Sequence, residues 1–151
     1  MASGPFLNTG GWKTLVTAND STAQEMLGSI RFENGKIFRY VLAGGTIAAS
    51  DAVKSSGTTG TTVITTTAAA NQKVVGVAET AITNAQYGWI TVYGKATCKV
   101  VVSTAAGAVL DADSGTAGTL KLAVSGDLNT GDAVAMETGV AAGSLVFLTC
   151  L

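Results

Sequence analysis

Residues 28–41 read GSIRFENGKIFRYV, and they carry the clearest structural pattern in the chain. Asn34-Gly35 at the centre is the pair preferred by a two-residue type I′ turn, whose central residues both need positive φ. Strand-like alternation flanks this pair on each side, so the sequence predicts a β-hairpin. The predicted cross-strand pairs match hydrophobic and charged partners: Phe32 with Ile37, Ile30 with Arg39, Arg31 with Phe38, and Glu33 with Lys36.

Short apolar or β-branched runs recur after this hairpin, separated by Gly, Asn, Asp and Ser. Such spacing is typical of a sandwich or barrel, whereas alternating strands and helices would need long amphipathic helices. The best helical candidate, residues 21–26, is too short for that. The predicted fold is all-β, a compact β-barrel or β-sandwich with an extended N-terminal arm and little helix. The expected strands are 61–67, 73–78, 87–93, 98–103, 120–124, 133–136 and 144–149, with turns or loops at 50–51, 54–60 and 111–115.

The composition excludes several classes of function. Charged residues are 13% of the 151 residues, against about 25% in ordinary globular domains. The formal net charge is −1 with scattered basic residues, so binding to nucleic acid is not expected. The chain has no histidine, which excludes Ser-His-Asp catalysis and imidazole metal ligands. No GxGxxG or GxxxxGK[ST] motif is present, so we expect no cofactor and no enzymatic activity.

Targeting and redox signals are equally weak. The N-terminal sequence MASGPFLNTGGWK lacks a basic region followed by an apolar run of signal-peptide length. No stretch approaches the roughly 18 apolar residues of a membrane-spanning helix, so no membrane partner is expected. Cys98 and Cys150 lie among strand-like residues without a CxxC spacing, and we expect two buried free thiols rather than a disulfide or reactive pair.

Residues 1–27 differ from the single β-rich domain predicted for residues 28–151. Gly and Pro interrupt this polar stretch, and it shows neither helical nor strand periodicity. Phe6, Leu7 and Trp12 would lower solubility in a free tail. We therefore interpret residues 1–27 as an arm that binds a partner through these three side chains; a frayed terminus is the alternative.

Two further groups of residues have site-like patterns. Asp111 and Asp113 could offer oxygens to Ca²⁺, but the spacing does not fit an EF-hand, so an Asp-rich turn without a metal is expected. Tyr87, Trp89 and Tyr93 share one face of a predicted strand whose two faces both look buried. We expect these rings in the core or at a subunit interface; a carbohydrate-binding platform is the alternative.

A weak internal echo links Asp51-Ala52-Val53 with Asp132-Ala133-Val134. In a chain so rich in Ala and Val, it is either coincidence or a sign of equivalent strands in a barrel. The spacing is too irregular for a solenoid.

The order of four stretches resembles the small capsid decoration (cement) proteins of tailed bacteriophages. They are GSIRFENGKIFRYV (28–41), GGTIAASDAV (44–53), KVVGVAETAITNAQYGWITVYGKA (73–96) and GTLKLAVSGDLNTGDAVAMETGVAAGSLVFLTCL (118–151). The resemblance covers residues 28–151 and rests on loose Gly-Val-Ala and Gly-Asp-Ala-Val turns. It implies a β-rich head, a homotrimer and attachment to the major capsid protein of the expanded shell.

The expected function is therefore that of a non-enzymatic structural protein. It would be made in the host cytoplasm, bind the exterior of the capsid in the virion and stabilise the expanded shell. The alternative is a phage tail or head-fibre module that recognises host glycans, and this alternative needs a solvent-exposed aromatic row.

Overall fold

The computed structural model describes residues 11–69, 72–124, 131–139 and 143–150. These ranges form eleven strands and no helix, which confirms the all-β prediction, and no helix in them could span a membrane. Residues 21–26, the best helical candidate, contain bends and no helix. The strands are β1 (Asn19–Asp20), β2 (Ile30–Glu33), β3 (Lys36–Ala43), β4 (Asp51–Ser55), β5 (Thr62–Thr65), β6 (Gly76–Ala78), β7 (Tyr87–Val100), β8 (Val109–Ala112), β9 (Thr119–Leu122), β10 (Ala133–Ala135) and β11 (Ser144–Thr149).

Strands β2 and β3 form the predicted hairpin. Asn34 and Gly35 have φ of 51° and 74°, as a type I′ turn requires, and all four predicted cross-strand pairs occur. The expected ion pair between Glu33 and Lys36 is absent. Lys36 instead bonds both oxygens of Glu79 at 2.7 and 2.9 Å, while Glu33 pairs with Arg31 at 2.5 Å.

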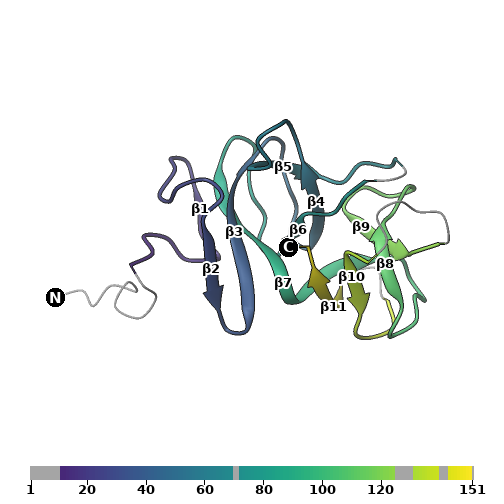
Figure 1. Ribbon diagram of the computed structural model, residues 1–151. Coiled ribbons are helices and arrows are strands. Elements are labelled where there is room, and N and C mark those ends of the chain that lie inside the picture. Colours follow the sequence, from purple (N-terminus) through teal and green to yellow (C-terminus); the bar gives the residue numbers. More distant parts are fainter. Residues whose placement is uncertain (1–10, 70–71, 125–130, 140–142, 151) are drawn as a thin grey trace.

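Strand β7 is the longest element and the centre of the sheet (Figure 1). The separate strands predicted at 87–93 and 98–103 are wrong, because one strand of 14 residues runs from Tyr87 to Val100. It pairs with β1, β3, β6, β9 and β11. Its first half contributes to one closed set of strands and its second half to another.

The first set, which we call barrel A, is a ring of five strands. The ring runs from β7 to β3, β5, β4, β6 and back to β7. The second set, barrel B, runs from β7 to β9, β8, β10, β11 and back to β7. Figure 1 shows β7 passing from barrel A on the left to barrel B on the right.

The two barrels repeat the same backbone plan. The Ser50 N–H bonds to the Ala78 carbonyl over 2.7 Å, and the Gly107 N–H, 57 residues later, bonds to the Ala135 carbonyl over 2.7 Å. In each barrel the first and third strands pair in parallel, and the other four pairings are antiparallel. Three more N–H to carbonyl bonds of barrel A recur 57 residues later in barrel B. The bond from Gly44 to Val63 matches that from Val101 to Leu120, the bond from Thr66 to Ala52 matches that from Ala123 to Val109, and the bond from Ser56 to Thr62 matches that from Asp113 to Thr119.

This repeat is not the echo seen in the sequence. Asp51-Ala52-Val53 lies in β4, whose counterpart in barrel B is β8, whereas Ala133-Val134 lies in β10. Residues 50–51 and 111–115 were expected as turns, but Asp51 begins β4 and Asp111 lies within β8. The Asp51 carboxylate accepts hydrogen bonds from the Thr65 hydroxyl and the Lys99 ammonium, and that of Asp111 accepts one from the Ala112 N–H, so both carboxylates have partners within the sheet.

Each barrel has its own hydrophobic core. Even-numbered residues of β7 point inward in both halves, with Ile90 and Val92 in barrel A and Ala96 and Cys98 in barrel B. The barrel A core contains Val41, Ala43, Ile47, Val53, Val63, Ala78, Ile82, Ile90 and Val92. The barrel B core contains Ala96, Cys98, Val100, Leu110, Ala112, Leu120, Ala133, Ala135, Val146, Leu148 and Cys150, and Ala52, Val74 and Val77 from the barrel A side pack in the same cluster.

Gly94 marks the point where β7 changes barrels. The register between β3 and β7 shifts at Ile37, and Gly94 then has a φ of +98°. A Cβ atom at Gly94 would lie 2.8 Å from the Gly35 carbonyl oxygen, inside contact distance. Glycine is therefore required here for two reasons: the backbone has positive φ, and the hairpin turn at Gly35 leaves no room for a side chain.

We expect Gly94→Ala to lower the free energy of unfolding by about 3 kcal/mol, since it adds a clash to left-handed strain. Gly107→Ala is the matched control, because Gly107 has a φ of +83° with nothing within 4 Å of a built Cβ. Its cost should be about 1 kcal/mol. Urea denaturation followed by circular dichroism measures both, and equal losses would show that the contact with Gly35 is unimportant.

Candidate functional site

The outer face of barrel A along β3 and β7 is aromatic, and the arm covers it. Tyr40 and Trp89 are buried with ring centroids 5.0 Å apart. Trp12 packs edge-on against Trp89 at 5.3 Å, and Val16 and Leu27 join the same cluster. The described part of the arm, residues 11–27, therefore packs on the barrel of its own chain.

Arg31 fixes the arm to the hairpin. Its guanidinium carbon lies 5.9 Å from the ring centroid of Trp12 and 5.8 Å from that of Trp89, within range of a cation–π interaction. Its Nη1 donates a 2.8 Å hydrogen bond to the Thr14 carbonyl, and Glu33 neutralises the charge. This buried arginine joins the arm to β2 and to the aromatic face.

The predicted aromatic residues therefore have different environments. Trp89 is 3% exposed, Tyr87 is half-buried and stacks on Tyr40, and Tyr93 is 37% exposed, so burial of both strand faces is wrong at Tyr93. The exposed row that glycan binding needs is not formed, because Trp12 covers Trp89. Phe6 and Leu7 lie outside the described residues.

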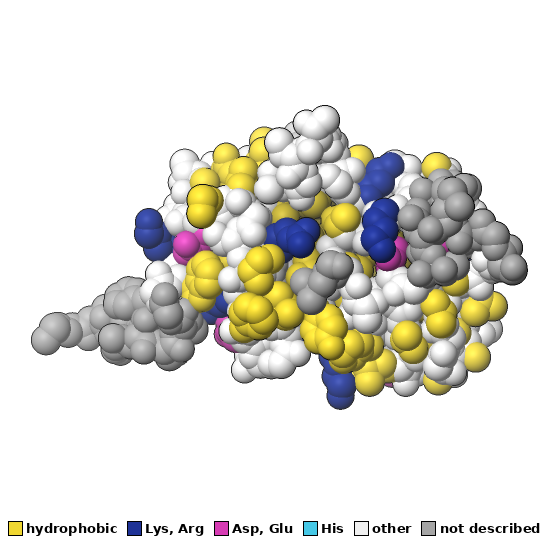
Figure 2. Space-filling view, in the orientation of Figure 1, with side chains coloured by type: hydrophobic (Ala, Val, Ile, Leu, Met, Phe, Trp, Pro, Cys, Tyr) yellow, Lys and Arg dark blue, Asp and Glu magenta, His cyan; other side chains and the backbone are white. Residues whose placement is uncertain are grey.

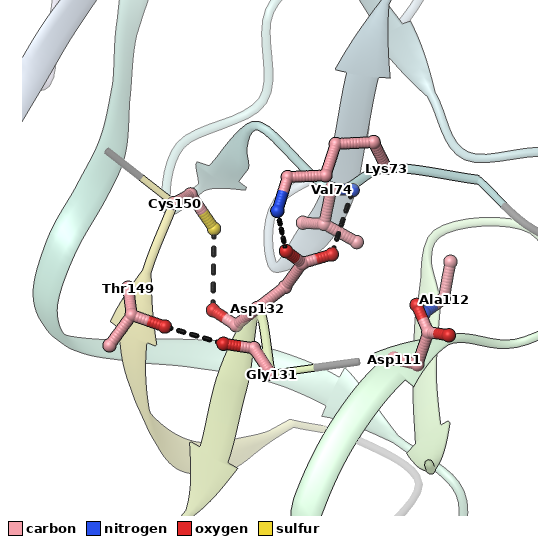
Figure 3. Close-up of polar contacts among 8 residues, drawn as sticks. All are labelled: Lys73, Val74, Asp111, Ala112, Gly131, Asp132, Thr149 and Cys150. Carbon is pink, nitrogen blue, oxygen red and sulfur yellow. Dashed lines mark hydrogen bonds and ion pairs between the residues drawn. The ribbon is translucent and has the colours of Figure 1, made fainter. Parts of the chain in front are cut away.

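Buried carboxylates join the two barrels. Asp132, fully buried beside β10, accepts hydrogen bonds from the Lys73 ammonium and from the Val74 N–H at 3.1 Å (Figure 3). The hydrogen bond to Asp132 raises the pKa of Lys73. Asp51 of β4 accepts one from Lys99 on the barrel B half of β7. Asp51 of barrel A thus pairs with a lysine of barrel B, and Asp132 of barrel B pairs with a lysine of barrel A. Both carboxylates have structural roles.

The two aspartates of the Asp-rich segment, Asp111 and Asp113, each accept a hydrogen bond from a nearby backbone N–H. The Asp113 carboxylate accepts the Gly115 N–H at 3.1 Å, which confirms the predicted turn at that residue. Asp111 is buried, its carboxylate accepts the Ala112 N–H at 2.7 Å, and Figure 3 shows it apart from Asp132. No group of three or more metal-ligating side chains occurs among the described residues.

An apolar band crosses the exterior of both barrels and is the candidate interaction site. Phe32 lies opposite Ile37, which is half-buried against the barrel A core and lies opposite Tyr93 on β7. The Tyr93 ring meets the Phe147 ring of β11 at 5.3 Å. The band continues through Val134 of β10, opposite Phe147, to Val109 of β8. Figure 2 shows hydrophobic side chains running obliquely across the molecule from over β2 and β3 toward β11 and β10.

Shallow hollows flank the hairpin turn within this band. One of about 470 Å³ is lined by Phe32, Ile37 and Tyr93, and another of about 350 Å³ by Lys95 and Phe147. Phe32 itself is 74% exposed. Such a surface offers apolar contacts and few hydrogen bonds, which suits packing against another protein better than chemistry on a small molecule.

Sequence reasoning found only part of this band. Tyr93 was singled out, and the hairpin register placed Phe32 beside Ile37. Phe147 and Val134 were expected as strand residues, but their exposure depends on which strands pair with β11 and β10. Residues 145–148 are a continuous apolar run, so the sequence carries no alternation from which the exposed face of this strand could be identified.

Comparison with known proteins gives a structural likeness to a phage head protein and no match at the level of family or curated sequence. The crystal structure of the head fibre gp8.5 N base in bacteriophage phi29 matches with a TM-score of 0.52 and 20% sequence identity. The match covers 74% of this chain and 90% of that chain, and it shows a shared fold.

The two cysteines are free and buried, as predicted. Burial raises the pKa of the Cys150 thiol to about 12 and also raises that of Cys98. In mildly alkaline buffer we therefore expect Ellman's reagent to leave both native thiols unmodified and to titrate both in concentrated guanidinium chloride. Rapid reaction of the native protein would contradict the burial of the reacting cysteine.

Proposed function

We propose that this protein is a non-enzymatic structural component of a tailed-bacteriophage head that binds the outer surface of the capsid and stabilises the expanded shell. The fold shared with the N base of a phage head fibre, over 90% of that chain, carries the proposal. The sequence resemblance of residues 28–151 to capsid decoration proteins supports it independently.

The surface chemistry supports this role. A protein that stiffens a shell needs several shallow contacts rather than one deep site, because contacts made together act at high effective concentration. The exposed apolar band is such a surface. With only 13% charged residues, the exterior also has few long side chains to immobilise on packing.

The proposed partners are the major capsid protein and further copies of this chain, as a homotrimer. In this proposal Phe6 and Leu7 of the arm anchor it to the capsid, with main-chain hydrogen bonds added if the arm pairs with an exposed strand. Trp12 has a different part in the proposal. Its contacts with Trp89 and Arg31 hold the base of the arm on barrel A, so it supports the anchors indirectly.

Co-sedimentation tests the capsid role. Purified protein mixed with expanded, undecorated shells of the phage that encodes it should sediment with them at a fixed number of copies per capsomer. Light scattering of the free protein should give three times the 15.0 kDa chain mass. Absence of co-sedimentation would overturn the proposed function, and a monomer mass would overturn the preformed homotrimer.

Deletion of residues 2–10 tests the arm. It removes Phe6 and Leu7 but retains Trp12, so we expect unchanged thermal stability and loss of co-sedimentation. Deletion of residues 2–20 is the contrasting variant, because it uncovers Trp89 and removes the Thr14 carbonyl from Arg31 and should lower the melting temperature. Wild-type sedimentation of the shorter deletion would contradict the capsid contact of Phe6 and Leu7.

A further inference from the structure

The apolar band has oppositely charged margins. Lys95 lies on β7, directly opposite Phe147 of β11. Glu137 follows β10, on the other side of β11, and accepts a 2.7 Å hydrogen bond from the Leu145 N–H. Neither Lys95 nor Glu137 forms an ion pair with another residue in the described ranges.

We propose that this band is the contact surface between copies of the chain and that the copies pack head to tail. The side over β2, β3 and β7, bordered by Lys95, packs against the side over β8 and β10, bordered by Glu137, of the next copy. Lys95 of one copy then faces Glu137 of its neighbour.

The apolar side chains of the two sides fit this arrangement. Phe32 projects from the hairpin and is 74% exposed, whereas the opposite side presents Val109, Val134 and Met136, all partly exposed. Methionine adapts its shape to an incoming ring. An interface between identical subunits is mostly apolar with a few charged groups beside the apolar contacts, and here Lys95 lies beside Phe147 while Glu137 lies just beyond β10.

Charge complementarity favours a second copy as the occupant. A partner surface must be apolar in its middle, acidic beside Lys95 and basic beside Glu137, and the two sides of the band provide these features for each other. A contact between two different surfaces of identical chains repeats from copy to copy, and it forms a ring when the rotation between neighbours closes. The biological role of this ring rests on the proposed function, in which it multiplies the capsid contacts of each unit.

Substitution within the band tests the apolar contact. Phe147→Asp places a charge at the centre of the band, and we expect at least a hundredfold weaker self-association by sedimentation equilibrium. Val102→Asp is the matched control, since Val102 is 58% exposed on the turn after β7 and outside the band. Native circular dichroism and unreactive thiols identify folded variants. Equal weakening by both substitutions, or by neither, would overturn the proposal.

Charge exchange tests the head-to-tail pairing. Lys95→Glu and Glu137→Lys should each weaken association about tenfold at low salt, since each places like charges together. The double variant should restore the wild-type affinity, because it re-forms the pair with the charges exchanged. If the single variants weaken association and the double variant does not restore it, Lys95 and Glu137 do not pair. If the wild-type protein has the mass of a dimer, the copies do not form a head-to-tail ring.

These outcomes are independent of capsid binding, because the measurements use the purified protein alone. A ring that forms through the band but does not bind shells would refute the proposed function and leave this inference intact. If substitutions at Phe147 and Lys95 leave the oligomer mass unchanged and the variants still bind shells, this inference would be refuted and the proposed function would stand.

Discussion

One strand has to serve two hydrophobic cores, and this constraint organises the molecule. Along β7 the inward residues change from Ile90 and Val92 to Ala96 and Cys98 without a break in the chain. Where β7 changes partner strands, its pairing with β3 contains a bulge at Ile37. The residue with positive φ at this point is Gly94, which lies against the Gly35 carbonyl of the hairpin turn. Both barrels depend on this crossing, since neither ring closes without its half of β7.

Polar groups then hold the barrels in a fixed relation. The ion pair of Asp51 with Lys99 and that of Asp132 with Lys73 link the barrels in opposite directions. Both aspartates are buried, whereas the Lys73 and Lys99 side chains are 60% and 34% exposed, so each pair satisfies a buried carboxylate from the solvent side. Arg31 provides a third connection, between the arm and barrel A. The exposed band therefore runs over two barrels that these contacts join.

Local chemistry was readable from the sequence, and pairing at a distance was not. Asn34-Gly35 fixes a turn by backbone conformation alone, so the hairpin and its register were predicted correctly. The continuity of β7 was missed because Gly94 and the polar residues after it resemble a turn. Asp51 and Asp111 looked like turn residues because nothing local shows their buried partners. The repeat stayed hidden because equivalent positions share backbone hydrogen bonds rather than residue types, as Ser50 and Gly107 illustrate. The exposed band was missed in the same way, since exposure follows from strand pairing.

The shared strand also gives the protein an order of assembly during synthesis. Strands β3 to β6 and the barrel A half of β7 all precede residue 94, so this barrel can close while barrel B is still being translated. The second half of β7 then continues directly from the folded barrel A and is held in an extended conformation. On it β9 and β11 can pair without first nucleating a sheet. Vectorial synthesis thus reduces the number of long-range pairings that the second barrel must find unaided.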